Sequence, residues 1–347
     1  MNDNQSIQIK TKKEFQEIHQ LIKKAKAEAL KHVNKELINL YWSVGEFISL
    51  KLKSSEWGEA VVNQLAEYLQ QTQPELKGFS RRGLYRMLQF YETYSNFENV
   101  STLLTQIPWS SHLHIMAKTK TLEEKEFYIR MAVKENYTVR ELERQIDSCL
   151  YERVLLSKSN LPKHLKEYQK DSENVFRDTY VLEFLQLPEH FTEQDLRKKI
   201  VANLKKFLLE IGSDFSFIAE EYRIQVGGND YFIDLLFYHR ALSCLVAVEL
   251  KVTDFKPEYL GKINFYLEAL DRLSKKPNEN PSVGILLCKS KDTEVVEFAL
   301  SRNISPTLVA EYKTKLIDKK ILSEKLHELF QLEAPSNESN IEGKSSE

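Results

Sequence analysis

The sequence predicts an α + α/β protein: an all-helical N-terminal domain with a helix-turn-helix-like element, followed by a C-terminal domain with the element order αβββαβ. Apolar residues recur at helical spacing from Lys12 to about Tyr151. After Gly212 the period changes, and three apolar runs with strand-like alternation follow one another. The chain of 347 residues also has room for about two domains of roughly 150 residues each.

Capping signals mark where helices begin in the N-terminal half. Ser80 precedes RRGLYRMLQFYETY, and its hydroxyl can accept from a backbone N–H of the first turn. Thr121 and Thr138 are each followed three residues later by a glutamate, which is the spacing of a capping box. An earlier helix over roughly 58–71 stops before Gly78. The two helices on either side of this turn form the helix-turn-helix-like element.

The C-terminal half begins with a helix from about Thr192 to Leu209, which Gly212 ends. Strands and helices then follow in the order FSFIAEEYRIQV, YFIDLLFYHR, LSCLVAVELKV, PEYLGKINFYLEALDRL, SVGILLCK and TEVVEFALS. The third run is apolar on both faces, as a central strand must be. We therefore expect a helical domain over 10–155, a linker over 156–178, an α/β domain over 179–332 and a disordered tail over 333–347.

Composition excludes several classes of protein. The 49 basic and 51 acidic residues give a net charge of -2, so any binding of polyanions must depend on a local cluster of charge. The three cysteines, Cys149, Cys244 and Cys288, are far apart and fit neither a zinc knuckle nor a secreted disulfide framework. No signal peptide and no predominantly apolar stretch of 18 residues is present. We expect a protein of the reducing cytoplasm that is not inserted in a membrane.

The residues that indicate chemistry are Asp234 in one predicted strand and Glu249 with Lys251 in the next. Glu249 and Lys251 are two residues apart and share a face of their strand, and a hairpin would bring Asp234 beside them. Two neighbouring carboxylates repel unless a cation lies between them, and hard oxygen ligands suit Mg²⁺ or Mn²⁺. We expect Asp234, Glu249 and the backbone carbonyl of Leu250 to bind the metal, and Lys251 to hold the attacking water. The alternative is a surface salt bridge between Glu249 and Lys251 on an edge strand.

The order helix, hairpin, motif strand, helix and strand resembles the restriction-endonuclease-like fold of PD-(D/E)xK nucleases. Longer segments resemble the bacterial YhcG-like family, namely FLLEIGSDFSFIAEEYRI, KPEYLGKINFYLEALD and PSVGILLCKSKD in the second half and FSRRGLYRMLQFYETY, IPWSSHLHIM and VRELERQIDSCLYER in the first. The resemblance implies a Mg²⁺-dependent nuclease that acts on DNA. It also implies that Asp234, Glu249 and Lys251 are the motif residues.

Two further positions follow from the resemblance. Glu210 matches the helix carboxylate that many such folds place beside the metal, although an exposed residue at the end of a helix is the alternative. Lys262 stands where many relatives have glutamine, on the helix that faces the site. It could contact the scissile phosphate or mark an altered activity. Tyr266, one turn later, is expected to pack rather than react.

A DNA-binding surface is expected on the helix that begins at Arg81. Arg81, Arg82 and Arg86 lie on this helix, the second of the helix-turn-helix-like element, which could enter a major groove. A solvated basic face on a packed helix is the alternative. Similar folds often dimerise, but the residues do not decide whether this chain does. Two other functions stay open: a DNA-binding protein that has lost catalysis, and a subunit of a restriction or defence assembly that needs partner proteins.

Overall fold

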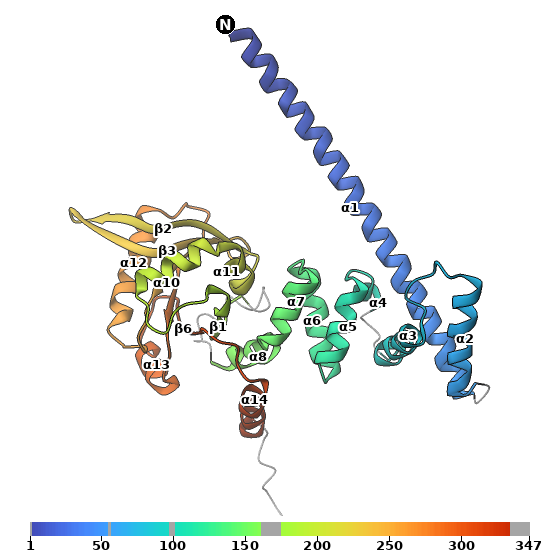
Figure 1. The fold of residues 1–347 in the computed structure, drawn as a ribbon. Helices are drawn as coiled ribbons and strands as arrows, with labels where there is room; N and C mark the ends of the chain where they lie inside the picture. Colours follow the sequence, from blue (N-terminus) through green and yellow to red (C-terminus); the bar gives the residue numbers. More distant parts are fainter. Residues whose placement is uncertain (1, 55–56, 97–100, 161–174, 334–347) are drawn as a thin grey trace, which may run out of the picture. The chain divides into compact units, whose positions relative to one another are not determined.

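The computed structural model describes residues 2–54, 57–96, 101–160 and 175–333. The chain divides into two compact units, Met1–Ile146 and Asp147–Glu347 (Figure 1). Residues 161–174 of the predicted linker and 334–347 of the predicted tail lie outside the described residues.

The first unit is all-helical, as the apolar spacing predicts. Its helices are α1 (Asn2–Lys53), α2 (Glu59–Thr72), α3 (Arg81–Tyr94), α4 (Ser101–Leu104), α5 (Trp109–Lys118), α6 (Leu122–Lys134) and α7 (Val139–Asp147). The predicted cap at Ser80 is confirmed, since Gly83 donates its backbone N–H to Ser80 Oγ at 3.3 Å. At Thr121 only half of the predicted box is present: the Glu124 N–H donates to Thr121 Oγ1 at 3.2 Å, but the Glu124 carboxylate accepts from the Lys120 N–H and not from Thr121. At Thr138 the box is reciprocal: the Thr138 N–H donates to Glu141 Oε2 at 2.8 Å, and the Glu141 N–H donates to Thr138 Oγ1 at 3.3 Å.

Helices α1 and α3 approach each other closely at Gly45. A Cβ atom added to Gly45 would lie 2.1 Å from the backbone oxygen of Met87, so only glycine allows this contact. Around it, Ile48 of α1 packs with Leu84 and Met87 of α3. This contact fixes the C-terminal half of α1 to the rest of the first unit.

The second unit is a six-stranded mixed sheet with helices. Its elements are α8 (Leu150–Asn160), β1 (Thr179–Val181), the short 3₁₀ helix η1 (Glu183–Leu185), α10 (Glu193–Ala202), α11 (Leu204–Ile211), β2 (Phe215–Val226), β3 (Asn229–His239), β4 (Cys244–Leu250), α12 (Tyr259–Leu273), β5 (Val283–Cys288), α13 (Thr293–Leu300), β6 (Thr307–Lys313) and α14 (Lys319–Glu333). The predicted order αβββαβ is confirmed by α10 to β5. The short β1 strand and β6, which the sequence analysis did not identify, extend the sheet.

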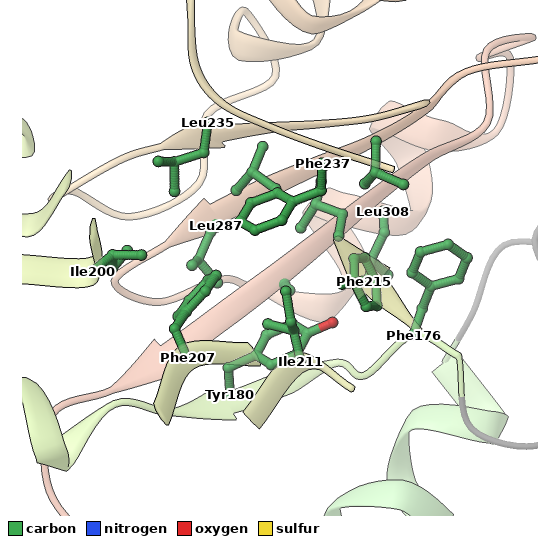
Figure 2. Packing of buried hydrophobic residues seen from close by; sticks show 14 of the residues in the cluster. Phe176, Tyr180, Ile200, Phe207, Ile211, Phe215, Leu235, Phe237, Leu287 and Leu308 are labelled. Carbon is green, nitrogen blue, oxygen red and sulfur yellow. The ribbon is translucent and has the colours of Figure 1, made fainter. Parts of the chain in front are cut away.

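The strands lie in the order β1-β6-β5-β4-β3-β2. β4 is antiparallel to β3 and parallel to β5, and every one of its residues is buried, as the prediction of a central strand requires. One face of the sheet packs against α11, and Figure 2 shows Phe207 and Ile211 directed toward Phe237 and Leu287 of the sheet. The other face packs against α12 through Ile263 and other apolar residues. The one charged side chain of β4, that of Glu249, is therefore enclosed by two apolar layers.

The structure corrects the helix predicted from Thr192 to Leu209. It is two helices, because the backbone leaves the helical conformation at Asn203. The Asn203 side chain donates to the carbonyl of Lys199 at 3.0 Å, so its amide competes with the main chain for a helical acceptor. The break allows α10 and α11 to cover different parts of the sheet.

The limits of the helical part also differ from the predicted 10–155. Helix α8 packs within the second unit, where Arg153 is fully buried. The guanidinium of Arg153 donates to Glu210 Oε1 at 2.7 Å and to the carbonyl of Thr179 at 3.0 Å. An arginine can be buried only with such partners, and these partners belong to α11 and β1.

Candidate active site

Asp234 and Leu250 are joined where the pairing of β3 with β4 ends. The last paired residues are Leu235 and Val248. Beyond this point the Leu250 N–H donates to Asp234 Oδ2 at 2.9 Å instead of to a strand partner. The carboxylate thus replaces a backbone acceptor, which fixes the Asp234 side chain beside the end of β4.

Glu249 is the most enclosed acid of this site, with a side chain only 1% exposed. Its Oε1 atom accepts from Lys251 Nζ at 3.0 Å and also from Lys262 Nζ. Its Oε2 atom is buried and has no hydrogen-bond partner among the described residues. Burial raises the pKa of the Glu249 carboxyl and the charge of Asp234 raises it further, while Lys262 and Lys251 lower it. A buried acceptor without a partner is costly, so this site favours an added cation or donor.

Lys251 links the strand to helix α10. Its ammonium group donates to Glu249, and it also donates to both carboxylate oxygens of Glu193 at 3.2 Å. Burial lowers the pKa of Lys251, but the charges of Glu249 and Glu193 outweigh this effect and hold it above its ordinary value. The ring of Tyr259 lies 5.3 Å from the ammonium nitrogen. Lys251 is therefore held as a cation in a defined position.

Glu193 is a site residue that the sequence analysis missed. It is the first residue of α10 and lies within the Thr192–Asp195 capping box. An acidic residue in the first turn is ordinary for any helix, because it interacts favourably with the helix dipole. Only the fold reveals that this end of α10 meets the end of β4.

Arg197, one turn after Glu193, is a second residue that the sequence did not reveal. Its Nη1 atom donates to Asp234 Oδ1 at 3.3 Å, and its Nη2 atom lies 2.7 Å from Glu221 Oε1. Glu221 has a φ of 46° within β2, which is unusual for a residue with a side chain. The guanidinium thus neutralises part of the charge of Asp234 and joins it to the edge strand.

Lys262 lies on the helix that faces the site, as expected. Its side chain is 47% exposed, and its ammonium group reaches Glu249 Oε1. A Cβ atom added to Gly284 of β5 would lie 2.7 Å from Ile263 Cγ1, so α12 packs closely on the sheet at this level. Tyr266 packs, since its hydroxyl donates to the carbonyl of Phe232 at 2.7 Å.

The structure does not place Glu210 as the sequence analysis expected. Its side chain is 0% exposed, which rules out the exposed helix end. Its Oε1 atom accepts from Arg153 at 2.7 Å and from the Val181 N–H at 2.9 Å. The sequence cannot show that a distant arginine would occupy this carboxylate. The helix carboxylate that reaches the Asp234, Glu249 and Lys251 group is Glu193.

The predicted basic helix, α3, belongs to the first unit. Arg81 and Arg82 are exposed, whereas Arg86 is half-buried. The Arg81 guanidinium lies 5.8 Å from the centre of the Tyr85 ring. Two of the three arginines are thus exposed at the surface, and the third is partly covered.

The donor set around Asp234 fits a hard divalent cation. Asp234 and Glu249 supply carboxylate oxygens, and Glu249 Oε2 has no protein partner among the described residues. Elsewhere in the described ranges, as here, no group of three or more His, Cys, Asp or Glu side chains is arranged to hold a metal ion. Mg²⁺ commonly takes only one or two carboxylates and completes its ligand shell with water and substrate phosphate. Two acids and a carbonyl suit such an ion better than they suit zinc.

None of the helices in the described part of the chain is long and apolar enough to cross a membrane.

The chain is similar to two family models, to one named relative and, over a smaller part, to a solved structure. Residues 173–328 match the family model of the YhcG PDDEXK nuclease domain, and residues 17–153 match that of the DUF1016 N-terminal domain. A protein of Escherichia coli (strain K12) named "Putative nuclease YhcG" is 29% identical over 354 residues, which cover 90% of this chain and 93% of that protein. The crystal structure of a repair endonuclease from Pyrococcus abyssi is similar over 37% of this chain and half of its own, with 18% identity and a TM-score of 0.27.

The acidic site lies within the first of these matches, at the end of β4. Together the two matches span both units, in the order in which the sequence predicted them. The chain belongs to the YhcG-like PD-(D/E)xK nuclease family, with a DUF1016 N-terminal domain followed by a PDDEXK nuclease domain.

Proposed function

We propose that this chain hydrolyses phosphodiester bonds of DNA as an endonuclease that depends on Mg²⁺ or Mn²⁺. The observation that carries the proposal is the buried Glu249 carboxylate, whose Oε2 has no partner among the described residues although Lys251 and Lys262 bind Oε1. Asp234 is held next to this group by the Leu250 N–H. The family match and the name of the Escherichia coli relative support a nuclease.

Asp234 and Glu249 would hold the metal, together with the backbone carbonyl of Leu250. When bound, the ion polarises the phosphate and lowers the pKa of a coordinated water. Lys251 is a cation fixed between Glu249 and Glu193, so it can orient a water and offset negative charge that develops on the phosphate. Its elevated pKa keeps it protonated at neutral pH, which suits electrostatic stabilisation rather than proton abstraction.

We assign Lys262 a direct contact with the substrate phosphate and Arg197 a positioning role. Lys262 is half exposed and reaches Glu249 from α12, so its ammonium can leave this carboxylate for an incoming phosphate. Arg197 contacts both Asp234 and Glu221, so it can keep Asp234 oriented before a metal enters. Both cations offset the repulsion between the two acids.

The proposal predicts cleavage that requires a divalent metal and the acidic site. Purified full-length chain should cut or nick supercoiled, linear or branched DNA with Mg²⁺ or Mn²⁺ and not with EDTA. Asp234→Asn and Lys251→Met should each lower the rate by roughly 100-fold or more, because each removes a charge fixed at the reacting phosphate. Gel-based cleavage assays measure both effects.

Matched control residues lie on β3 and in the segment between β4 and α12. Asp230 is on β3 and pairs with Arg223 at the surface, and Lys256 is exposed between β4 and α12. Asp230→Asn and Lys256→Met should cut within about twofold of the parent. DNA binding without cutting under any metal would contradict the proposal in favour of a binding protein that has lost catalysis. Cutting only after cell extract is added would indicate a subunit of a larger assembly, such as a restriction or defence complex.

Replacing Glu193 and Glu210 by glutamine should have different effects on cleavage rate and on stability. Glu193→Gln should lower the cleavage rate by about 10-fold or more with little change in stability, because Glu193 is partly exposed and pairs with Lys251. Glu210→Gln should leave the specific activity of folded protein nearly unchanged. It should lower the free energy of unfolding by about 3–5 kcal/mol, because it leaves the buried Arg153 guanidinium without its carboxylate partner. Urea unfolding and cleavage rates measured on both variants test the assignment, and the reverse pattern would return Glu210 to the active site.

The exposed arginines of α3 are proposed to contact the DNA backbone, with Arg86 contributing less because it is half-buried. The double variant Arg81→Ala and Arg82→Ala should bind DNA more weakly. The slope of log affinity against log salt should become shallower by about 2, since each lost phosphate contact removes roughly 0.9. Arg130→Ala is the control, because Arg130 is already paired with Glu126 at 2.5 Å. An unchanged slope, measured by fluorescence anisotropy, would exclude α3 from the interface.

A further inference from the structure

Helix α1 carries an exposed apolar stripe that the proposed nuclease function does not use. The stripe is made of residues three, four or seven positions apart, which places them on one side of the helix. We define the α1 stripe as Phe15, Ile18, Ile22, Ala25, Ala29, Val33, Leu37, Leu40 and Phe47. The large side chains of this set are between 41% exposed, at Leu37, and 66% exposed, at Phe15.

Except at its last residue, Phe47, whose ring lies 5.7 Å from the ring of Trp57, the stripe is not the face through which α1 packs in its own unit. Ile38 and Gly45, on the far side of the helix from Ala29, are the buried or closely packed positions, and Gly45 lies against α3. Figure 1 shows the N-terminal half of α1 extending beyond the other helices of the first unit. Isolated helices are marginally stable in water, and exposed apolar patches of this length usually mark an interface.

We propose that the α1 stripe is the interface between two copies of this chain, with the two α1 helices antiparallel. Charge selects this arrangement. Residues 17–35 contain five lysines and two glutamates, a net charge of +3, whereas residues 36–50 contain Glu36 and Glu46 and no lysine or arginine, a net charge of -2. An antiparallel copy places the basic half of each helix against the acidic half of the other. A parallel copy would place the two basic halves together.

Side-chain size agrees with a two-fold axis near Val33. In that register Ala29 of one copy lies opposite Leu37 of the other, and Ala25 lies opposite Leu40. Small residues therefore face large ones, which allows two helices to interdigitate. The stripe spans 33 residues, or about 50 Å of helix at 1.5 Å per residue. With a contact strip roughly 10 Å wide on each copy, the pair buries on the order of 1,000 Å² in total, the lower bound for a specific interface.

Two alanines of α1 provide a matched test. Ala29 lies on the stripe and Ala27 on the opposite face, and both are exposed. In sedimentation velocity on the full chain, the parent should be a dimer at micromolar concentrations. Ala29→Glu should raise the dimer dissociation constant at least 10-fold, because it buries an unpaired charge. Ala27→Glu should change it less than twofold, and circular dichroism should show equal helix content in both variants.

Orientation is tested by cysteine cross-linking in the full chain, whose own cysteines are buried. Under mild oxidation Val33→Cys should form a disulfide with a second copy of itself. A mixture of Ala25→Cys and Leu40→Cys chains should give a mixed dimer, while Ala25→Cys alone should not cross-link. A parent that stays monomeric, a dimer that Ala29→Glu does not weaken, or efficient self-cross-linking of Ala25→Cys would each overturn the proposal. These readouts are independent of nuclease activity.

Discussion

The burial of the Glu249 carboxylate at the end of the central strand is the constraint on which the site depends. β4 has neighbours on both sides and apolar layers on both faces, so an acid in this strand has little access to water. Lys251 and Lys262 both donate to Oε1 of Glu249. The other carboxylate oxygen, Oε2, has no partner among the described residues. A hydrophobic residue would pack in the same space at less cost. The position of this glutamate is therefore explained by chemistry rather than by stability.

The surrounding groups follow from this constraint. Asp234 lies close enough for its charge to raise the pKa of Glu249, so the two acids repel in the absence of further positive charge. Arg197 and Lys262 supply that charge from α10 and α12. Lys251 is held in position by hydrogen bonds to the Glu193 carboxylate at the start of α10. Helices α10 and α12 thus both reach the end of β4. Each contributes charged side chains whose partners lie on β3 or at the end of β4.

Much of this arrangement could be predicted from the sequence, because buried strands appear as local runs of apolar residues. The strand predicted over 215–226 has the bounds of β2, and the third apolar run, which forms β4, was correctly interpreted as a central strand. Asp234, Glu249 and Lys251 were found because charges inside apolar strands are conspicuous. Glu193 and Arg197 left no such signal, since charged residues are ordinary on the first turns of any helix. The misplacement of Glu210 and the break at Asn203 have the same cause, because both depend on contacts that a local pattern does not contain.

Binding of the metal itself tests the central claim most directly. Isothermal titration calorimetry of the full chain with Mn²⁺ or Mg²⁺, without nucleic acid, reports whether the site that contains Glu249 binds a divalent cation. The account predicts saturable binding by the parent. It also predicts affinity at least 10-fold weaker in Glu249→Gln, because the amide keeps the shape of the side chain and loses its charge. A parent that binds no divalent ion, or a Glu249→Gln chain that binds as well as the parent, would contradict the account.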